Sequence, residues 1–160
     1  TKGNHMLYIL GLYFQGVGEN LKTEEFAFTS QKYNNHMIIL VPQLEVERII
    51  YNKTIALTKY FLKHYVINSK QGYISGYSGG GETLSLVLTK SPELYCRALS
   101  VHRNGMGILI IVENKTPIYF VIGEDDEYYG SSPFKEVYQE LVNFYKKQGL
   151  SDEENEIMLI

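Results

Sequence analysis

The sequence predicts a three-layer α/β/α sandwich, in which helices cover both faces of a mainly parallel β-sheet. Short runs rich in Leu, Ile, Val and Tyr alternate along the chain with runs whose apolar residues recur at helical spacing. Some of the short runs are apolar at every position, which is typical of strands buried on both faces of a parallel sheet. Strands that alternate with helices form such sheets because each connecting helix packs back onto a sheet face.

The first half of the chain predicts two strands and one helix. The strand segments are rich in β-formers, and glycines or a proline follow each of them. Residues 16–20 are interpreted as a break after the first strand. The predicted strands span residues 7–14 and 37–41, and the predicted helix spans about residues 52–65, with a buried face formed by Ile55, Tyr60, Phe61 and His64 or Tyr65.

The second half predicts strands and helices in alternation. Ser91 and Pro92 stop the first helix. Ser132 is expected to cap the second helix, with Pro133 at its first position and Gly149 just past its end. The predicted strands span residues 72–77, 97–102, 117–122 and the start of another at 156–160, and the predicted helices span 82–89 and about 132–147.

Composition and charge exclude several classes of protein. The 160 residues are 44% hydrophobic and 21% charged, which is typical of one soluble globular domain. The net charge of -3 excludes a strongly basic nucleic-acid binder. The single cysteine, Cys96, excludes an internal disulfide framework and a cysteine-rich zinc site. Because no apolar run is long enough to span a membrane and no leader is recognisable, we expect a cytoplasmic protein without membrane partners, or a secreted one whose signal was removed.

The sharpest motif is Gly76-Tyr77-Ser78-Gly79-Gly80, which has the form G-x-S-x-G between a predicted strand and a predicted helix. A serine at such a turn, a nucleophile elbow, is raised from the sheet toward a substrate cleft. The following helix directs backbone N–H groups at the site, so the Gly79 N–H is a candidate oxyanion-hole donor. The alternative is a glycine-rich turn that only closes a strand–helix unit.

With this motif the sequence resembles the α/β-hydrolase superfamily, and within it serine hydrolases of the prolyl oligopeptidase and esterase type. Four segments carry the resemblance over nearly the whole chain. They are residues 14–19 (FQGVGE), 41–43 (VPQ), 73–81 (YISGYSGGG) and 117–130 (PIYFVIGEDDEYYG). Residues 12–16 (LYFQG) also look like a protease-site remnant, but their place in an apolar strand pattern favours a native segment.

The resemblance implies roles for several residues. Ser78 matches the nucleophile, and the Gly79 N–H matches one oxyanion donor. Gly16 and Val17 lie where the second backbone donor is expected. Gln15 stands where the family usually has a histidine, and it is a candidate pocket residue.

The acid of the catalytic triad is expected at Asp126, with Asp125 as second choice, because the resemblance places the acid in the loop after residues 117–122. A solvated acidic loop is the alternative interpretation of this cluster. Tyr77 and Tyr128 are further candidate pocket residues.

The general base is missing from its expected place. Members of the family carry the histidine after the acid, and none follows Asp126 here. The resemblance therefore implies a single domain, residues 1–160, truncated at both ends, or a degenerate member. His102 ends the strand expected beside the Ser78 strand, and we interpret it as a pocket residue more readily than as a substitute base. The four histidines are His5, His36, His64 and His102.

The leading hypothesis is a serine hydrolase that cleaves carboxylic esters, or less readily peptide bonds, through a Ser78 acyl-enzyme. This hypothesis requires no cofactor and no metal, and its substrate is a small-molecule ester or peptide. The sequence is compatible with both a monomer and a homo-oligomer. The second hypothesis is a non-catalytic binding module with this fold. A nucleotide- or flavin-binding domain is a third, although the glycine-rich turns lack both a P-loop and a dinucleotide fingerprint.

Overall fold

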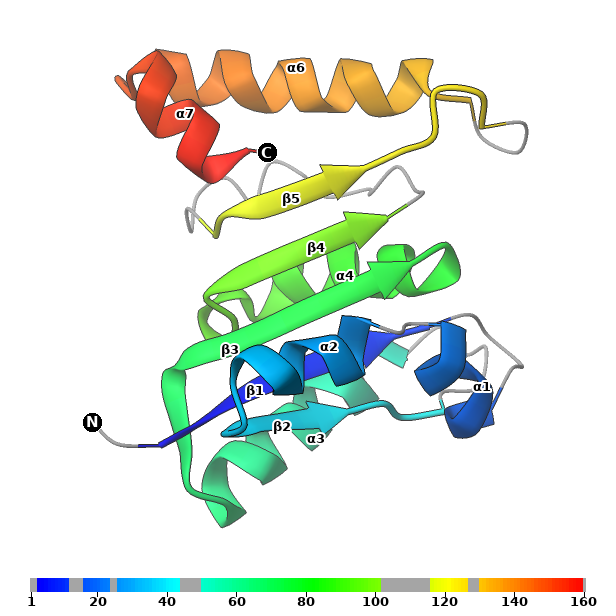
Figure 1. Ribbon diagram of the computed structural model, residues 1–160. Coiled ribbons are helices and arrows are strands. Elements are labelled where there is room, and N and C mark those ends of the chain that lie inside the picture. The colour runs from blue at the N-terminus through cyan, green and yellow to red at the C-terminus, as the bar shows by residue number, and fades with distance from the viewer. Residues whose placement is uncertain are drawn as a thin grey trace.

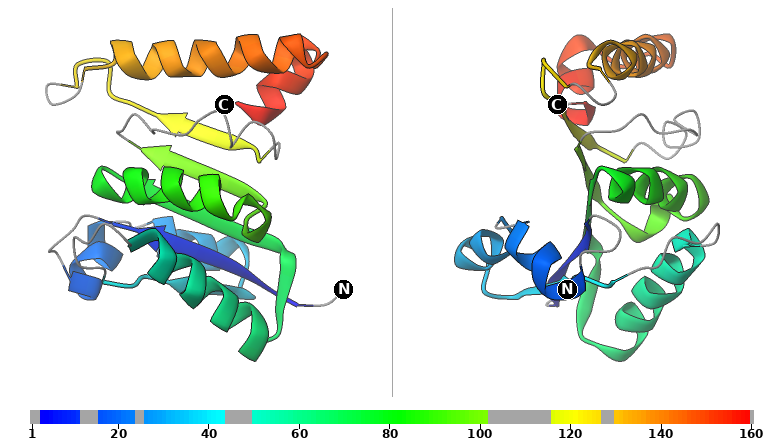
Figure 2. Two further views of the ribbon diagram at one scale, coloured as in Figure 1. Left: turned by 180° about the vertical axis from the view of Figure 1, so that it is seen from behind. Right: turned by 90° about the vertical axis from the view of Figure 1, so that its right-hand side faces the viewer.

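The sheet contains five parallel strands in the order β2-β1-β3-β4-β5. The computed structural model describes residues 3–11, 16–23, 26–43, 50–101, 116–126 and 130–159. Figures 1 and 2 show α1 and α2 on one face of the sheet and α3 and α4 on the other, which confirms the predicted three-layer α/β/α architecture. The strands are β1 (Asn4–Leu10), β2 (Met37–Leu40), β3 (Ile67–Tyr77), β4 (Arg97–Val101) and β5 (Ile118–Val121).

The helices begin and end close to predicted stop signals where such signals exist. Lys90 ends α4 directly before Ser91 and Pro92, and Gly149 follows α6 with φ 86°. Ser131, not Ser132, precedes the first residue of α6, and it makes no side-chain capping hydrogen bond. The helices are α1 (Gly16–Thr23), α2 (Phe26–Tyr33), α3 (Ile50–His64), α4 (Gly79–Lys90), the 3₁₀ turn η1 (Pro92–Leu94), α6 (Ser132–Lys147) and α7 (Asp152–Met158).

The main core lies between the sheet and the helices α3 and α4. Side chains of a strand alternate between the two faces, so Met6 and Tyr8 of β1 point toward α4 while Leu7 and Ile9 point toward α1 and α2. β1 spans Asn4–Leu10 and is buried on both faces from Met6 onward, so the strand predicted at 7–14 begins too late, and Gly11 is not part of it. The prediction that the run at 37–41 is buried on both faces is wrong, because β2 is an edge strand and only its Leu40 is buried.

Helix α3 turns only part of the predicted face to the core: Ile55 and Phe61 pack against the core cluster, as predicted, but the most deeply buried positions differ. Thr54 and Thr58 are completely buried, whereas Tyr60 and Tyr65 are about half exposed. The threonine hydroxyls are satisfied inside the helix because Thr54 donates to the Ile50 carbonyl oxygen and Thr58 to that of Thr54. Two polar residues can therefore occupy the buried face without an unpaired group.

The predicted strand at 156–160 is wrong, because helix α7 occupies most of this segment. Ser151 and Glu154 form a capping box, in which each side chain bonds the backbone N–H of the other residue. The cap starts a helix that continues through Met158. Only Leu159 makes a strand-like contact, an isolated parallel bridge to Ile118 of β5.

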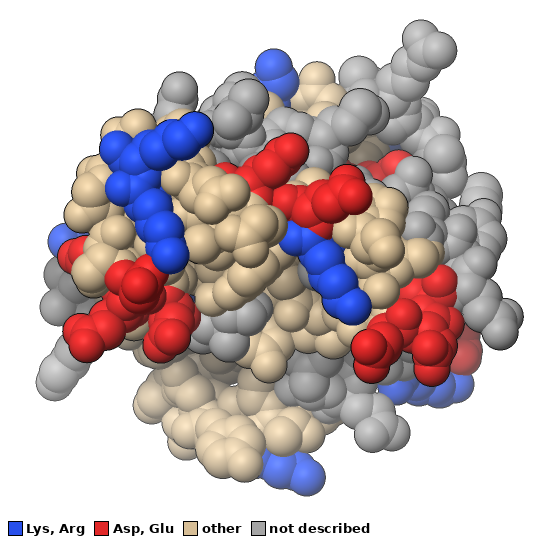
Figure 3. All heavy atoms as spheres, turned by 90° about the horizontal axis from the view of Figure 1, so that it is seen from above, with Lys and Arg blue, Asp and Glu red and all other residues tan. Residues whose placement is uncertain are grey.

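Helices α6 and α7 lie beside β5, and Phe120 of that strand packs against Tyr138 of α6. On the face in Figure 3, lysine and arginine side chains lie among aspartates and glutamates rather than in one basic patch. Lys146 and Asp152 form an ion pair at 2.7 Å. Within the described ranges, no helix combines the length and the apolar character needed to cross a membrane.

Candidate functional site

The carboxyl ends of the strands assemble the candidate site. Since all five strands are parallel, the segments that follow them leave the sheet at one edge, where open α/β sheets bind their ligands. Ser78 directly follows β3, and Asp126 lies in the turn after β5. The α1 helix, which begins with Gly16 and Val17, follows β1, the neighbour of β3. The fold thus gathers most of the predicted site residues at one edge.

Ser78 has a strained backbone. Its φ of 50° and ψ of -119° make it the only non-glycine residue with positive φ in the described part of the chain. Such a conformation costs about 1–3 kcal/mol and persists only where the surroundings enforce it. Here the Ser78 N–H donates to the Val101 carbonyl oxygen at 3.0 Å, and the Gly81 N–H donates to the Ser78 carbonyl oxygen at 2.8 Å. Both sides of the residue are therefore held.

The Ser78 side chain does not cap α4. Serine is a favoured N-cap because its oxygen accepts a hydrogen bond from the first turn when the backbone is extended. At Ser78 the backbone is not extended, and no side-chain capping bond forms. The half-buried residue occupies the cap position without the usual capping role, so helix stability does not explain the strained serine.

Close packing requires glycine on both sides of this turn. A Cβ atom on Gly76 would lie 2.5 Å from the Gly80 carbonyl oxygen. A Cβ atom on Gly80 would collide with the carbonyl oxygen of Leu10, the last residue of β1. The first turn of α4 is therefore pressed against β1 and β3, which fixes Ser78 at the edge of the sheet.

The amino end of α4 brings partial positive charge to Ser78. The N–H groups of a first helical turn point out of the helix, and the peptide dipoles add to a positive end. Gly79, Gly80 and Gly81 form this first turn, and all three are buried. With no side chains in the way, their backbone can approach a bound anion closely.

Asp126 lies at the same edge as Ser78, two strands away. Its N–H donates to the Gly123 carbonyl oxygen at 3.2 Å, and its own carbonyl oxygen accepts from Gly130 N–H at 3.1 Å. β4 separates β3 from β5, so the two strands lie about 10 Å apart at the usual strand spacing. Asp126 is half-buried while Asp125 is exposed.

Gly16 and Val17 form the first turn of α1, so the predicted break at residues 16–20 is wrong: this segment is helical. Its amino end faces the same edge as that of α4 (Figure 1). Sequence reasoning also missed Asn20, which is 3% exposed and packs against Gly11. No hydrogen-bond partner of its Oδ1 exists among the described residues. A lone asparagine in a helix carries no sequence signal that could have identified it.

The comparisons concern structures, because no protein-family model matches the sequence and no curated protein matches it either. A thermostable esterase superposes with a TM-score of 0.74 at 18% identity, over 89% of this chain and 44% of that one. Esterase PE8 superposes with a TM-score of 0.69 at 11% identity, over 89% of this chain and 79% of that one. Est1E from Butyrivibrio proteoclasticus superposes with a TM-score of 0.63 at 10% identity, over 88% of this chain and 76% of that one.

This is the α/β-hydrolase fold. The chain spans less than half the length of the thermostable esterase, and identities this low establish the fold alone. In this α/β-hydrolase fold, Ser78 follows the central strand β3, which has two strands on either side in the order β2-β1-β3-β4-β5.

The histidines that the structure describes lie away from Ser78. His5 lies near the amino end of β1, and His36 precedes β2. His64 ends α3 and packs against Tyr60, with ring centroids 4.3 Å apart and ring planes tilted by 33°. All three belong to the amino edge of this α/β-hydrolase sheet, opposite Ser78. His102, Gln15 and Tyr128 lie outside the described residues, while Tyr77 is half-buried at the end of β3.

Other reactive groups do not compete with Ser78. Cys96 precedes β4 at the amino edge, and burial raises the pKa of its thiol, so little thiolate forms at neutral pH. In the described part of this chain, no three His, Cys, Asp or Glu side chains group as metal ligands.

Proposed function

We propose that the chain is a serine hydrolase that cleaves carboxylic esters through an acyl-enzyme on Ser78. The carrying observation is the strained Ser78 backbone between the strictly glycine positions Gly76 and Gly80. Strain of this kind is retained where function needs it. The three esterases with the same fold support an ester rather than a peptide substrate, and peptide-bond cleavage is the less favoured form of the proposal.

The proposed reaction begins when the Ser78 Oγ attacks the ester carbonyl carbon while a histidine takes the hydroxyl proton. The carbonyl oxygen becomes an oxyanion, which accepts hydrogen bonds from the Gly79 N–H and from the first turn of α1 at Gly16 or Val17. The intermediate then expels the alcohol, which receives the proton from the histidine. Water hydrolyses the acyl-enzyme by the same steps, releasing the carboxylic acid and restoring Ser78.

Asp126 has the role of holding the histidine in the tautomer that can accept the serine proton. Its half-buried place after β5, at the edge that carries Ser78, supports this role. The histidine itself has two sources in this proposal. One is His102, whose sequence neighbour Val101 accepts the Ser78 N–H. The other is a histidine outside these 160 residues.

The decisive experiment is covalent labelling with a fluorophosphonate, which reacts with activated serines. In a form of the protein that contains the catalytic histidine, we expect intact-mass analysis to show one adduct and peptide mapping to place it on Ser78. The 160-residue chain should react slowly or not at all unless His102 is the base. Ser78→Ala should lose the adduct, and Ser75→Ala, a matched change in the same strand, should keep it. Wild type, Ser78→Ala and Ser75→Ala are then assayed with p-nitrophenyl acetate and p-nitrophenyl butyrate. In a protein that contains the catalytic histidine, Ser78→Ala should lower turnover by at least about 10⁴-fold.

The non-catalytic binding module remains the second candidate, because the three described histidines lie at the opposite edge of the sheet. This alternative predicts no fluorophosphonate adduct on Ser78 in any longer form of the protein. Labelling of the Ser78→Ala variant to the wild-type level would contradict the hydrolase proposal directly, since the probe would then mark another residue.

A further inference from the structure

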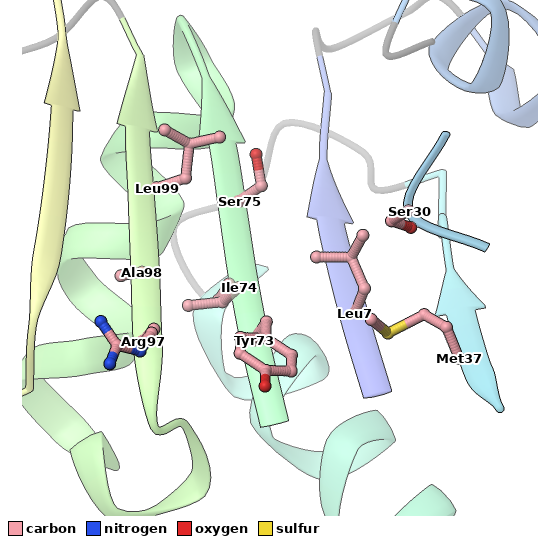
Figure 4. A pocket seen from close by; sticks show the side chains of 9 residues that line it. All are labelled: Leu7, Ser30, Met37, Tyr73, Ile74, Ser75, Arg97, Ala98 and Leu99. Carbon is pink, nitrogen blue, oxygen red and sulfur yellow. The ribbon is translucent and has the colours of Figure 1, made fainter. Parts of the chain in front are cut away.

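A cavity lies on the sheet face that carries α1 and α2, opposite α4. Figure 4 shows its lining side chains on β1 to β4, with Ser30 of α2 at one side. Its volume is about 270 Å³. The cavity does not belong to the Ser78 site, because Ser75 lies three residues earlier on β3, roughly 10 Å back along the strand.

Register explains why this cavity is apolar. Leu7 of β1 pairs with Tyr73 of β3, and Tyr73 pairs with Arg97 of β4, so their side chains form one row across the sheet. Leu99 extends the wall along β4, and Met37 closes it on the β2 side. All of these side chains except that of Arg97 present hydrocarbon or ring surface to the cavity.

Arg97 provides the charge at the rim. The residue is exposed, and it makes no ion pair with any residue of the described ranges. Its guanidinium lies close enough to Tyr73 to oppose the burial that raises the pKa of that phenol. The cavity thus combines an apolar wall with one cation at its edge that pairs with no acidic side chain of the described ranges, and no described lining residue is acidic.

We propose that this cavity binds a medium-chain carboxylate, with the hydrocarbon chain against Leu7, Met37 and Leu99 and the carboxylate at Arg97. The volume equals that of about nine liquid water molecules at roughly 30 Å³ each, so it suits a ligand of about that many non-hydrogen atoms. Octanoate, whose two oxygens extend to the rim, is the matching probe. A guanidinium and a carboxylate form strong, charge-assisted hydrogen bonds. This inference does not rest on the proposed hydrolase activity.

The test is titration of octanoate into the purified chain, followed by calorimetry and by backbone amide chemical shifts. We expect saturable binding below about 1 mM, with shifts centred on residues 73–75 and 97–99. Arg97→Gln should lower the affinity for octanoate at least about tenfold, and Arg97→Lys should restore part of that affinity. Lys90→Gln removes an exposed positive charge on α4 and should leave the affinity unchanged. Octanol, which lacks the carboxylate, should bind wild type and Arg97→Gln equally.

Several results would overturn the proposal. These are absence of binding, equal affinity of wild type and Arg97→Gln, or shifts centred on the turn at residue 78. Binding that disappears in Ser78→Ala would assign octanoate to the hydrolase site instead. Tyr119 and Val121 of β5 extend the same sheet face and are 47% and 38% exposed. Sedimentation tests whether the chain self-associates through these residues. Self-association that excludes octanoate would make this face an interface between two copies of the chain.

Discussion

The two edges of the sheet differ in a way that the side-chain inventory alone does not reveal. The amino edge holds more titratable chemistry, with three histidines and Cys96, yet its groups pack on neighbours, as His5 does on Tyr73. The carboxyl edge holds Ser78, Asp126 and the amino ends of α1 and α4. Only there is a non-glycine residue of the described ranges held in strained geometry. Backbone geometry, not the number of reactive side chains, identifies the candidate site.

The strongest way to break this comparison is to remove the acid at the carboxyl edge. Asp126→Asn should lower ester turnover by about 10²–10⁴-fold with little change in KM, because the base would lose its orientation. The matched change Asp125→Asn, one residue earlier in the same turn and exposed, should stay within about twofold. Steady-state kinetics with p-nitrophenyl butyrate checks both. A larger loss in Asp125→Asn would transfer the acid role to that residue.

The packing of the Ser78 turn gives the next largest effect. Gly80→Ala should destabilise the fold by about 2–4 kcal/mol, because the new Cβ collides with the Leu10 carbonyl oxygen. Gly18→Ala is the control, since nothing lies within 4 Å of a Cβ there and a helix favours alanine by about 1 kcal/mol. Urea unfolding of both variants measures the difference. A Gly80→Ala protein as stable as wild type would refute the tight turn.

The smallest expected effect is at the amino edge. Replacing His5, His36 and His64 together by glutamine should leave fluorophosphonate labelling of Ser78 within about twofold, because all three lie at the far end of the strands. Cys96→Ser should be equally silent, since burial keeps that thiol protonated. A labelling rate that falls more than about tenfold in the triple variant would place the base at the amino edge.

The sequence predicts the parts of this molecule that local chemistry determines. The central strands are found because their segments are rich in Leu, Ile, Val and Tyr, and the Ser78 turn because its glycines and serine form one short motif. The helix α1 was missed, since Gly16 and Gly18 are poor helix formers. The buried face of α3 is predicted only in part: Ile55 and Phe61 pack against the core, but Thr54 and Thr58 satisfy their hydroxyls within the helix and so bury like apolar residues.

Residues whose position depends on distant parts of the chain could not be predicted. That His5 stacks on Tyr73 follows from the pairing of β1 with β3, strands far apart in the sequence. The cavity beside Arg97 likewise requires the register of four strands. The orphaned amide oxygen of Asn20 depends on the close approach of α1 to Gly11. These features are products of the assembled sheet rather than of any segment.

The contact between Gly80 and the end of β1 has a practical consequence for protein engineering. It joins the serine turn and the end of β1 in one rigid body, so residues 10–11 and 76–81 must be kept together in any chimera. After β5 the constraint differs: nothing lies within 4 Å of a Cβ at Gly130, but its φ of 71° favours glycine, so a chimera should keep Gly130 together with the candidate acid Asp126. A library diversified at residue 80 would instead select against every side chain larger than glycine, because each would meet the Leu10 carbonyl oxygen.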